Sequence, residues 1–229
     1  MSCQRGARAP GCRRVTVTTV PPGLHPSLSP EALLAAYARG WFPMDEEGAR
    51  GAVGLYEADP RGVMPIRGFR VPPSVRRGLR RAGYAIRIDA AFDEVVAACA
   101  QDKEGVWLTP RLGEAYGRLH RLGRAHSVEA WRGGRLAGGL FGVALGGLFT
   151  SESMFHRERD AGNAVLVGAA DLLAERRFVL WDIQMTSPHT ARFGAVDLGR
   201  DEYLARLGEA LVLERSLAPS PGPAPGLTP

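Results

Sequence analysis

The order of hydrophobic and polar residues in this chain changes between the spacing of helices and the spacing of strands, which predicts a mixture of both. The helical spacing is clearest after Thr109-Pro110, a typical helix start. In the residues that follow, the apolar side chains fall on one helical face: Leu112, Ala115, Leu119 and Leu122. An earlier helix is predicted from the N-cap Ser29, which precedes Pro30, to the stop at Gly40.

The same signals divide the main body of the chain into further elements. Helices are predicted over residues 73–82, 90–101, 110–122, 164–176 and 202–213, and strands over residues 84–88, 127–131 and 178–184. A Gly133-Gly134 turn and a Gly-rich strand pair over residues 135–154 extend these strands into an antiparallel meander. A meander followed by a helix and a further strand predicts an α/β (α+β) fold, in which helices flank a mixed sheet.

Composition and turn signals predict four segments along the chain. Residues 1–23 lack periodicity and residues 216–229 are rich in Pro and Gly, so both are expected to be disordered tails. The turn-forming run Asp59-Pro60-Arg61-Gly62 is a predicted hinge. It separates a small N-terminal α/β unit, residues 24–62, from a main domain, residues 63–215.

The composition is that of an ordinary globular protein with a modest basic bias. The 229 residues are 45% hydrophobic and 23% charged, with a net charge of +5 and a pI near 9.5. Arg outnumbers Lys 28 to one. Guanidinium groups suit contacts with phosphates and bases, but a GC-rich coding bias would produce the same ratio, so the composition alone leaves both explanations open.

The chain has the features of a soluble cytoplasmic protein without a metal or disulfide framework. Cys3, Cys12 and Cys99 follow no ligand spacing. The N-terminus lacks the apolar stretch of a signal peptide. The least polar segment, residues 136–149, is too short and Gly-rich to span a bilayer.

Two predicted strands end in polar side chains that suit chemistry on an amine. Strand alternation places Asp182 and Gln184 on one face, so that the Asp is positioned to hold the Gln amide. The other strand carries Glu152 among the apolar Phe149 and Met154. This pattern predicts a site that orients an amine beside an apolar pocket. The alternative is two core strands that end in a satisfied polar pair.

Two other groups of polar residues are candidates for function. The helix over residues 73–82 carries four arginines on one face, either for phosphate contacts or as a solvated surface: Arg76, Arg77, Arg80 and Arg81. A Ser151 or Ser153 nucleophile with His156 lacks the G-x-S-x-G elbow of hydrolases. His126 is expected to be structural, bonded beside the sheet.

The motifs of the chain, taken in order, resemble those of the leucyl/phenylalanyl-tRNA–protein transferases. The matching segments lie in residues 35–43, 59–61, 105–109, 115–120, 125–129, 138–146, 152–155, 182–184 and 193–195. The resemblance implies a small N-terminal unit and a domain like the GNAT acetyltransferases. It also implies transfer of Leu, Phe and weakly Met from aminoacyl-tRNA to the N-terminal Arg or Lys of proteins, which marks them for N-degron proteolysis. No cofactor is implied, and a monomer is expected.

The resemblance also implies roles for particular residues. Gln184 would hold the attacking α-amine, with Asp182 polarising it, and Glu152 would lie near the amine of the transferred amino acid. The pocket for the Leu or Phe side chain would involve Leu140, Phe149, Met154, Leu166 and Trp181. Trp107 would stack on the terminal adenine, and the four arginines would contact the acceptor stem. Core packing is the alternative for each apolar residue, and a strand-end cap is the alternative for Asp182.

Several positions depart from the usual pattern of the family. They are Met44, Leu55-Tyr56-Glu57-Ala58, Pro72-Pro73, Ser151 and Asp160-Ala-Gly-Asn163. They bear on tRNA affinity and pocket shape, while Asp182 and Gln184 match the family. Two other functions stay open, an acyl-CoA N-acyltransferase of similar fold and a catalytically idle RNA-binding protein. The first would require a Gly-rich pyrophosphate loop, which residues 160–163 do not provide.

Overall fold

The computed structural model describes residues 16–19, 28–45, 53–101 and 107–218, which form two sheets. The smaller sheet has the strand order β1-β3-β2 and the larger has the order β10-β4-β9-β8-β7-β6-β5. The strands are β1 (Thr16–Thr19), β2 (Phe42–Asp45), β3 (Val53–Asp59), β4 (Arg61–Met64), β5 (Ala85–Ile88), β6 (Ala125–Arg132), β7 (Arg135–Leu145), β8 (Leu148–His156), β9 (Leu180–Gln184) and β10 (Val196–Leu198). Every pair in the larger sheet is antiparallel except β8 with β9.

The helices that begin at Pro30 and Pro110 follow the predicted capping residues Ser29 and Thr109. The helices of the described chain are α1 (Pro30–Tyr37), α2 (Pro73–Ala82), α3 (Phe92–Gln101), α4 (Pro110–Arg121), α5 (Ala161–Glu175), α6 (Pro188–Ala191) and α7 (Arg200–Leu211). The Ser29 hydroxyl accepts the Ala32 amide at the start of α1, and the Thr109 hydroxyl accepts the Leu112 amide at the start of α4. No helix in this part of the chain combines the length and apolar character needed to cross a bilayer.

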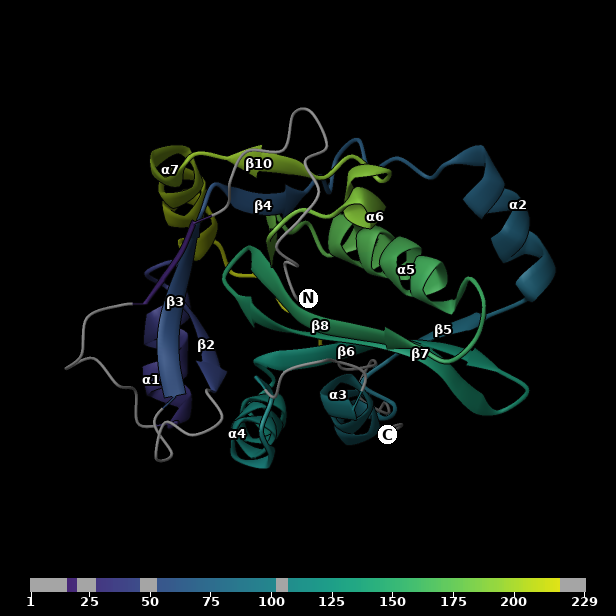
Figure 1. Cartoon of the computed structure of the whole chain (residues 1–229), viewed down its shortest axis with the longest axis horizontal. Coiled ribbons are helices and arrows are strands. Elements are labelled where there is room, and N and C mark those ends of the chain that lie inside the picture. The colour runs from purple at the N-terminus through teal and green to yellow at the C-terminus, as the bar shows by residue number, and fades with distance from the viewer. Residues whose placement is uncertain (1–15, 20–27, 46–52, 102–106, 219–229) are drawn as a thin grey trace, which may run out of the picture.

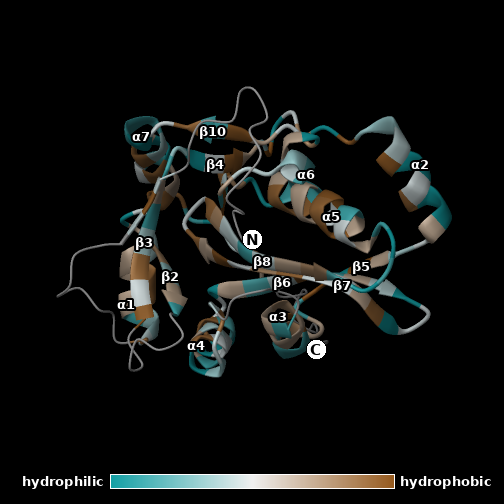
Figure 2. Ribbon diagram, in the orientation of Figure 1, coloured by the Kyte–Doolittle hydropathy of each residue, from teal (hydrophilic) through white to brown (hydrophobic). Residues whose placement is uncertain are grey.

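Helices cover both faces of the larger sheet (Figure 1). Helix α5 contacts strands β5 to β8 on one face, whereas on the other face α3 contacts β6 to β8 and α4 contacts β6. Hydrophobic residues colour much of α5, while α2 at the edge of the molecule is mostly hydrophilic (Figure 2). The predicted mixed α/β class, with a mostly antiparallel sheet flanked by helices, is confirmed.

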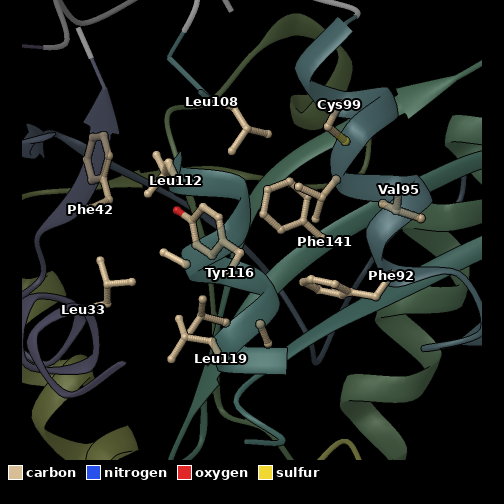
Figure 3. Packing of buried hydrophobic residues seen from close by; sticks show 14 of the residues in the cluster. Leu33, Phe42, Phe92, Val95, Cys99, Leu108, Leu112, Tyr116, Leu119 and Phe141 are labelled. Atoms are coloured by element: carbon tan, nitrogen blue, oxygen red, sulfur yellow. The ribbon is translucent and has the colours of Figure 1, made fainter. Parts of the chain in front are cut away.

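Alternation along β7 divides the core between the two faces of the sheet. Leu140 packs in the cluster under α5, and its neighbour Phe141 packs in the cluster with α3 and α4 (Figure 3). The cluster with α3 and α4 also includes Tyr37 of α1 and Tyr116 of α4, which connect the N-terminal unit to the larger sheet. A third cluster packs α7 against β4, β8 and β9, and includes Tyr203.

A β-bulge in β8 changes which side chains share a face. Phe141 pairs with Ser153 and Gly142 pairs with Ser151, so Glu152 is the additional residue in β8. Before the bulge, Phe149 packs under α5, and after it Met154 packs in the same cluster. Strict alternation would have placed these two residues on opposite faces.

The structure corrects the sequence predictions at both ends of the described chain. Thr16–Thr19, within the predicted N-terminal tail, form β1 and pair with β3. Leu217, within the predicted C-terminal tail, is 1% exposed and packs in the cluster under α5. The remaining tail residues lie outside the described ranges. The boundary at residue 62 stays a prediction; in the structure, a cis Asp59–Pro60 bond joins β3 of one sheet to β4 of the other.

Candidate active site

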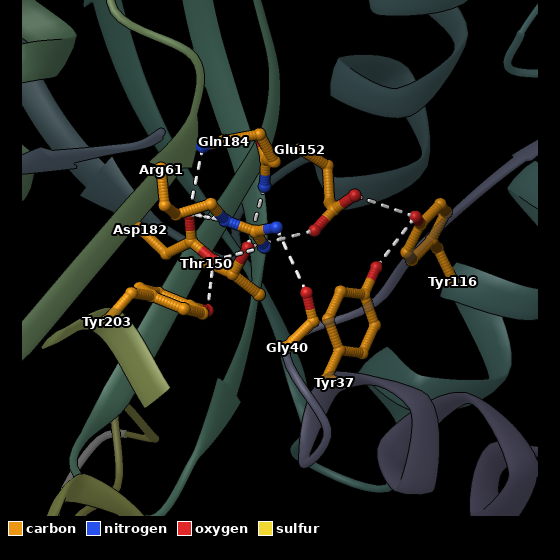
Figure 4. Close-up of polar contacts among 9 residues, drawn as sticks. All are labelled: Tyr37, Gly40, Arg61, Tyr116, Thr150, Glu152, Asp182, Gln184 and Tyr203. Atoms are coloured by element: carbon orange, nitrogen blue, oxygen red, sulfur yellow. Dashed lines mark hydrogen bonds and ion pairs between the residues drawn. The ribbon is translucent and has the colours of Figure 1, made fainter. Parts of the chain in front are cut away.

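The centre of the site is Asp182, a fully buried carboxylate on β9 that receives four hydrogen bonds (Figure 4). Arg61 donates from Nε to Oδ1 at 2.9 Å and from Nη2 to Oδ2 at 2.6 Å. The Tyr203 hydroxyl donates to Oδ2 at 2.7 Å, and the Gln184 backbone amide donates to Oδ1 at 2.8 Å. Asp182 is therefore an ion-paired and saturated carboxylate.

Arg61 connects Asp182 to the N-terminal unit. Its guanidinium is 1% exposed, donates to the Gly40 carbonyl at 3.0 Å, and lies over the rings of Phe42 and Tyr203. Burial by itself would lower the pKa of Arg61, but the Asp182 carboxylate raises that pKa above its ordinary value. Burial raises the pKa of Tyr203 well above its usual range, and the adjacent Asp182 raises it further. Both groups therefore keep their protons and act as fixed donors to Asp182.

Gln184 ends β9 in a strained turn. Its φ of 56° lies in the left-handed region, and the Met185 amide donates to the Ile183 carbonyl at 2.6 Å, which closes a γ-turn around it. The bond from the Gln184 amide to Asp182 holds this conformation. A further constraint is Gly62 of β4, because a Cβ there would lie 2.6 Å from the Thr186 nitrogen. The turn thus depends on Gly62 and Asp182 together.

The Gln184 side chain binds Thr150 rather than Asp182. Its Nε2 donates to Thr150 Oγ1 at 2.8 Å, across the pairing of Thr150 with Asp182 in the parallel strands. The expectation that Asp182 holds the side-chain amide is therefore wrong, because the carboxylate is occupied by other donors and takes the backbone amide instead. Among the described residues, none donates to Gln184 Oε1, which leaves this oxygen available as an acceptor.

Glu152 is the second carboxylate of the site, and its partners in the described part of the chain are hydroxyl groups. Tyr116 donates to Oε2 at 2.9 Å, Thr150 donates to Oε1 at 3.3 Å, and the Tyr37 hydroxyl lies 2.9 Å from that of Tyr116 (Figure 4). Removal from water raises the pKa of Glu152 to about 7, although the tyrosine hydroxyls oppose this shift. Glu152 forms no ion pair with any residue in the described ranges. It can therefore change its ionisation state near neutral pH.

The predicted pocket residues come together on the α5 side of β8 and β9. They share one apolar cluster: Leu140, Phe149, Met154, Leu166 and Trp181. The Trp181 Nε1 donates to Ser151 Oγ at 2.8 Å, which uses the Ser151 hydroxyl structurally. Only Met154 of the five keeps partial exposure, since the other four are at most 3% exposed. Core packing and a substrate pocket both remain compatible with this cluster.

The pairing of β8 with β9 stops at the polar residues. The two strands pair only from Leu148–Leu180 to Thr150–Asp182, and β8 then continues to His156 without β9. Glu152 and Met154 lie on this continuation, and Gln184 lies at the end of β9. The acceptor oxygen of Gln184, the titratable Glu152 and the partly exposed Met154 are thus at the place where the strands separate.

The hydrogen bonds of Asp182, Gln184 and Glu152 shown in Figure 4 involve none of the remaining predicted residues. Trp107 is partly buried against the cluster of α3 and α4, and its carbonyl accepts the Asp45 amide at 3.0 Å. Helix α2 spans the predicted residues, and its four arginines are exposed and form no ion pair with another described residue. We call these four the basic face of α2: Arg76, Arg77, Arg80 and Arg81. Val75 and Leu79 form its inner side.

Several other polar residues have structural partners. His126 is 2% exposed and lies 2.7 Å from Asp89 Oδ2 and 3.1 Å from the Gly123 carbonyl, as expected of a structural histidine. Asn163 Oδ1 accepts from His189 Nε2 at 3.0 Å, and Asn163 Nδ2 donates to Asp160 Oδ1 at 2.9 Å. In the described part of the chain, no group of three His, Cys, Asp or Glu side chains is placed to hold a metal ion.

The polar network, by which we mean the hydrogen bonds around Asp182, Gln184 and Glu152, includes five further residues to which the sequence assigned no role in the site. They are Tyr37, Arg61, Tyr116, Thr150 and Tyr203. Three of the five had a signal in the sequence, because the segments that resemble the family, residues 35–43, 59–61 and 115–120, contain Tyr37, Arg61 and Tyr116. Arg61 and Asp182 are 121 positions apart in the sequence, and no local pattern predicts such a contact.

The described geometry can be compared with known proteins. Among solved structures, the chain is similar to L-PGS from Bacillus licheniformis, with a TM-score of 0.44 and 12% identity over 69% of this chain and 66% of that chain. The sequence similarity to curated proteins is far stronger. A leucyl/phenylalanyl-tRNA–protein transferase of Rubrobacter xylanophilus is 50% identical over 192 residues, 83% of this chain and 99% of the relative. A protein of the same name from Akkermansia muciniphila is 43% identical over 187 residues, 80% of this chain and 96% of the relative.

The sequence profiles of the family cover both parts of the chain. The profile described as leucyl/phenylalanyl-tRNA protein transferase matches residues 63–208, and the profile of its N-terminal domain matches residues 27–59. The matches include Asp182, Gln184 and Glu152 and continue across the basic face of α2. The chain therefore belongs to the leucyl/phenylalanyl-tRNA–protein transferase family.

Proposed function

We propose that this protein transfers Leu or Phe, and weakly Met, from aminoacyl-tRNA to the N-terminal Arg or Lys of proteins, marking them for N-degron proteolysis. The family name implies an aminoacyl-tRNA donor and a protein acceptor. The observation that carries the proposal is the available Oε1 of Gln184, held at the end of β9 by the saturated Asp182. An amine has N–H groups to donate to such an oxygen.

The chemistry requires alignment more than acid–base catalysis. The acceptor nitrogen attacks the ester carbonyl carbon, a C–N bond forms, and the C–O bond to the terminal ribose breaks. The amine loses a proton and the ribose hydroxyl gains one. Because the ester is already activated, positioning can supply much of the barrier reduction, about 7–11 kcal/mol in favourable cases. Gln184 Oε1 would accept one N–H of the amine and direct its lone pair at the ester.

In this account Asp182 acts through the backbone. Its carboxylate fixes the γ-turn of Gln184, while Arg61 and Tyr203 fix the carboxylate. Because Asp182 is buried and both of its oxygens are occupied by these donors, we assign it a positioning role. The polarising role that the family resemblance implies for Asp182 stays a prediction.

The donor amino acid would lie where β8 and β9 separate. Met154 and the apolar residues behind it, Leu140, Phe149, Leu166 and Trp181, would contact its side chain, because a flexible thioether adapts to aliphatic and aromatic guests. Glu152 would face its α-ammonium, and a cation there would favour the ionised carboxylate. One methylene changes such binding by only about 1–3 kcal/mol, which accounts for acceptance of Leu, Phe and Met.

The tRNA itself would be bound by general contacts. The basic face of α2 carries four exposed cations that suit the phosphates of the acceptor stem. Trp107 would stack on the terminal adenine, which needs no sequence readout. We further propose that the protein is a cytoplasmic monomer. It would need no cofactor, because both substrates already carry the reacting groups.

The direct test is a transfer assay with the purified protein. Leucyl-, phenylalanyl- and methionyl-tRNA are each mixed with peptides that differ only in an N-terminal Arg, Lys or Ala. The expected product is the Arg or Lys peptide extended by Leu or Phe, with slower extension by Met and none on the Ala peptide. Transfer of Asp from aspartyl-tRNA would contradict the apolar pocket, and no transfer to any peptide would contradict the proposed function.

A further inference from the structure

We propose that Thr150 is a positioning residue that fixes the orientation of the Gln184 side-chain amide in the transfer site. The inference rests on the proposed function and concerns the same site. Thr150 lies on β8, is fully buried, and stands between Gln184 and Glu152. No motif of the sequence analysis singled it out.

The hydroxyl of Thr150 connects two groups that could otherwise orient independently. Its Oγ1 accepts from Gln184 Nε2 at 2.8 Å and donates to Glu152 Oε1 at 3.3 Å. A threonine hydroxyl has one proton. When Glu152 is ionised, its oxygens only accept, so that proton is donated to Glu152 and the hydroxyl oxygen can only accept from Gln184.

This constraint decides which end of the Gln184 amide faces Thr150. An amide can present either its oxygen or its nitrogen, and only the nitrogen can donate to Thr150. The oxygen must then point away from Thr150, at the end of β9, beyond the last pair of β8 with β9. An amide turned by 180° would present N–H groups to the acceptor amine and would no longer accept its proton-bearing N–H.

The position of Thr150 in the sheet explains why it can impose this constraint. It pairs with Asp182 in the parallel register of β8 and β9, two residues before Gln184. Asp182 fixes the Gln184 backbone, so the side chain can move only by rotation about its own bonds. Asp182 therefore sets the place of Gln184, and Thr150 sets the direction of its amide.

The test compares Thr150→Val, which keeps the β-branched shape and removes the hydroxyl, with Thr150→Ser, which keeps the hydroxyl. Transfer of Leu to an Arg-initiated peptide is measured at pH 8, with saturating leucyl-tRNA and varied peptide. Thr150→Val should lower kcat/KM for the peptide about tenfold to a hundredfold, because a misaligned group costs on the order of 100-fold. Thr150→Ser should restore most of the rate, and the Kd for leucyl-tRNA should not change.

A double-mutant cycle and a matched control separate positioning from general loss of structure. In a Gln184→Ala background, Thr150→Val should change the rate by less than about twofold, because its effect acts through the missing amide. The control is Ser127→Ala on β6, which removes another buried hydroxyl that donates to a carboxylate, Glu129 Oε1, at 2.8 Å. It should leave kcat/KM unchanged.

The possible outcomes distinguish this inference from the proposed function. Wild-type kcat/KM in Thr150→Val, equal losses in the Ser and Val variants, or additive losses with Gln184→Ala would each overturn the role of Thr150. Failure of the wild-type protein to transfer any amino acid would instead overturn the proposed function. A loss in Thr150→Val that Thr150→Ser reverses, absent in the Gln184→Ala background, supports the inference.

Discussion

The two ends of the polar network each contain a carboxylate, yet their surroundings differ. Asp182 receives a guanidinium on both oxygens, together with a tyrosine hydroxyl and a backbone amide. Within the described ranges, Glu152 receives hydroxyls, from Thr150 and Tyr116, and no cation. The first carboxylate is ion-paired with Arg61, and the second has a pKa raised to about 7 because burial removes it from water.

This difference indicates a division of roles within one site. Asp182 determines the geometry of the site, because donors from Arg61, Tyr203 and Gln184 occupy both of its oxygens. The Glu152 end keeps the capacity to bind a cation or to exchange a proton. A site that aligns one amine and binds another needs both properties, and the chain uses a different carboxylate for each.

The largest expected effect comes from breaking the Asp182 end. Arg61→Ala leaves Asp182 buried without its cation, which should lower the free energy of unfolding by about 3–5 kcal/mol. Urea denaturation measures this change. Arg61→Met combined with Asp182→Leu should recover much of the stability while remaining inactive in transfer. A decrease below about 1 kcal/mol in Arg61→Ala would show that the pair is not the anchor.

A smaller effect is expected from the glycine that underlies the γ-turn. Gly62→Ala would place a Cβ 2.6 Å from the Thr186 nitrogen, and such overpacking costs about 1–3 kcal/mol. The turn should shift and transfer should fall. The control is Gly208→Ala on α7. A Cβ at this position meets nothing in the described part of the chain within 4 Å, and alanine favours a helix more than glycine does, so this variant should be stable and active. Full activity in Gly62→Ala would contradict the dependence of Gln184 on this backbone.

The Glu152 end should be visible in the pH dependence of stability. Between about pH 4.5 and 7 the folded protein keeps the Glu152 proton while the unfolded chain releases it. Stability from this residue should therefore be greatest at low pH and decline as pH rises to about 7, with a slope of at most about 1.4 kcal/mol per pH unit. Glu152→Gln should remove this part of the slope. Identical slopes in both proteins would contradict the raised pKa of Glu152.

The smallest effect on stability is expected from the exposed arginines of α2. Replacing the basic face of α2 by alanine should change the free energy of unfolding by less than about 0.5 kcal/mol for each substitution, since single surface substitutions rarely do more. Binding of all charged tRNAs should weaken alike. The slope of log K for tRNA binding against log salt concentration should become less negative by roughly 0.9 for each phosphate that is no longer neutralised. The control removes four exposed arginines elsewhere: Arg39, Arg121, Arg200 and Arg206. An unchanged salt slope would assign α2 to an ordinary solvated surface.

Local signals predicted much of the fold. The caps at Ser29 and Thr109, the helix from Pro73 to Ala82 and the strand meander are in the structure where the sequence placed them. The strands between residues 42 and 64 were missed: β2 and β3 pair with each other over a short distance in sequence, but β2 has only four residues, and the partners of β4 are distant. Strand β4, for example, is held between β9 and β10, and its four residues carry too short a pattern to be recognised.

The candidate site was predicted in its residue types but not in its connections. Alternation correctly separated Asp182 from Trp181, since the first joins the polar network and the second the apolar cluster. It failed at Gln184, whose left-handed backbone turns the strand, and at the bulge of Glu152. Both are places where the backbone departs from regular geometry, so a period-2 pattern no longer reports the direction of a side chain.

The central claim is that Gln184 aligns the acceptor amine, and Gln184→Ala tests it most directly. Single-turnover transfer from saturating leucyl-tRNA to an Arg-initiated peptide should slow on the order of 100-fold, while the Kd for leucyl-tRNA and the Tm stay at wild-type values. Gln101→Ala, at an exposed position on α3, serves as the control and should transfer normally. A wild-type single-turnover rate in Gln184→Ala would contradict the claim.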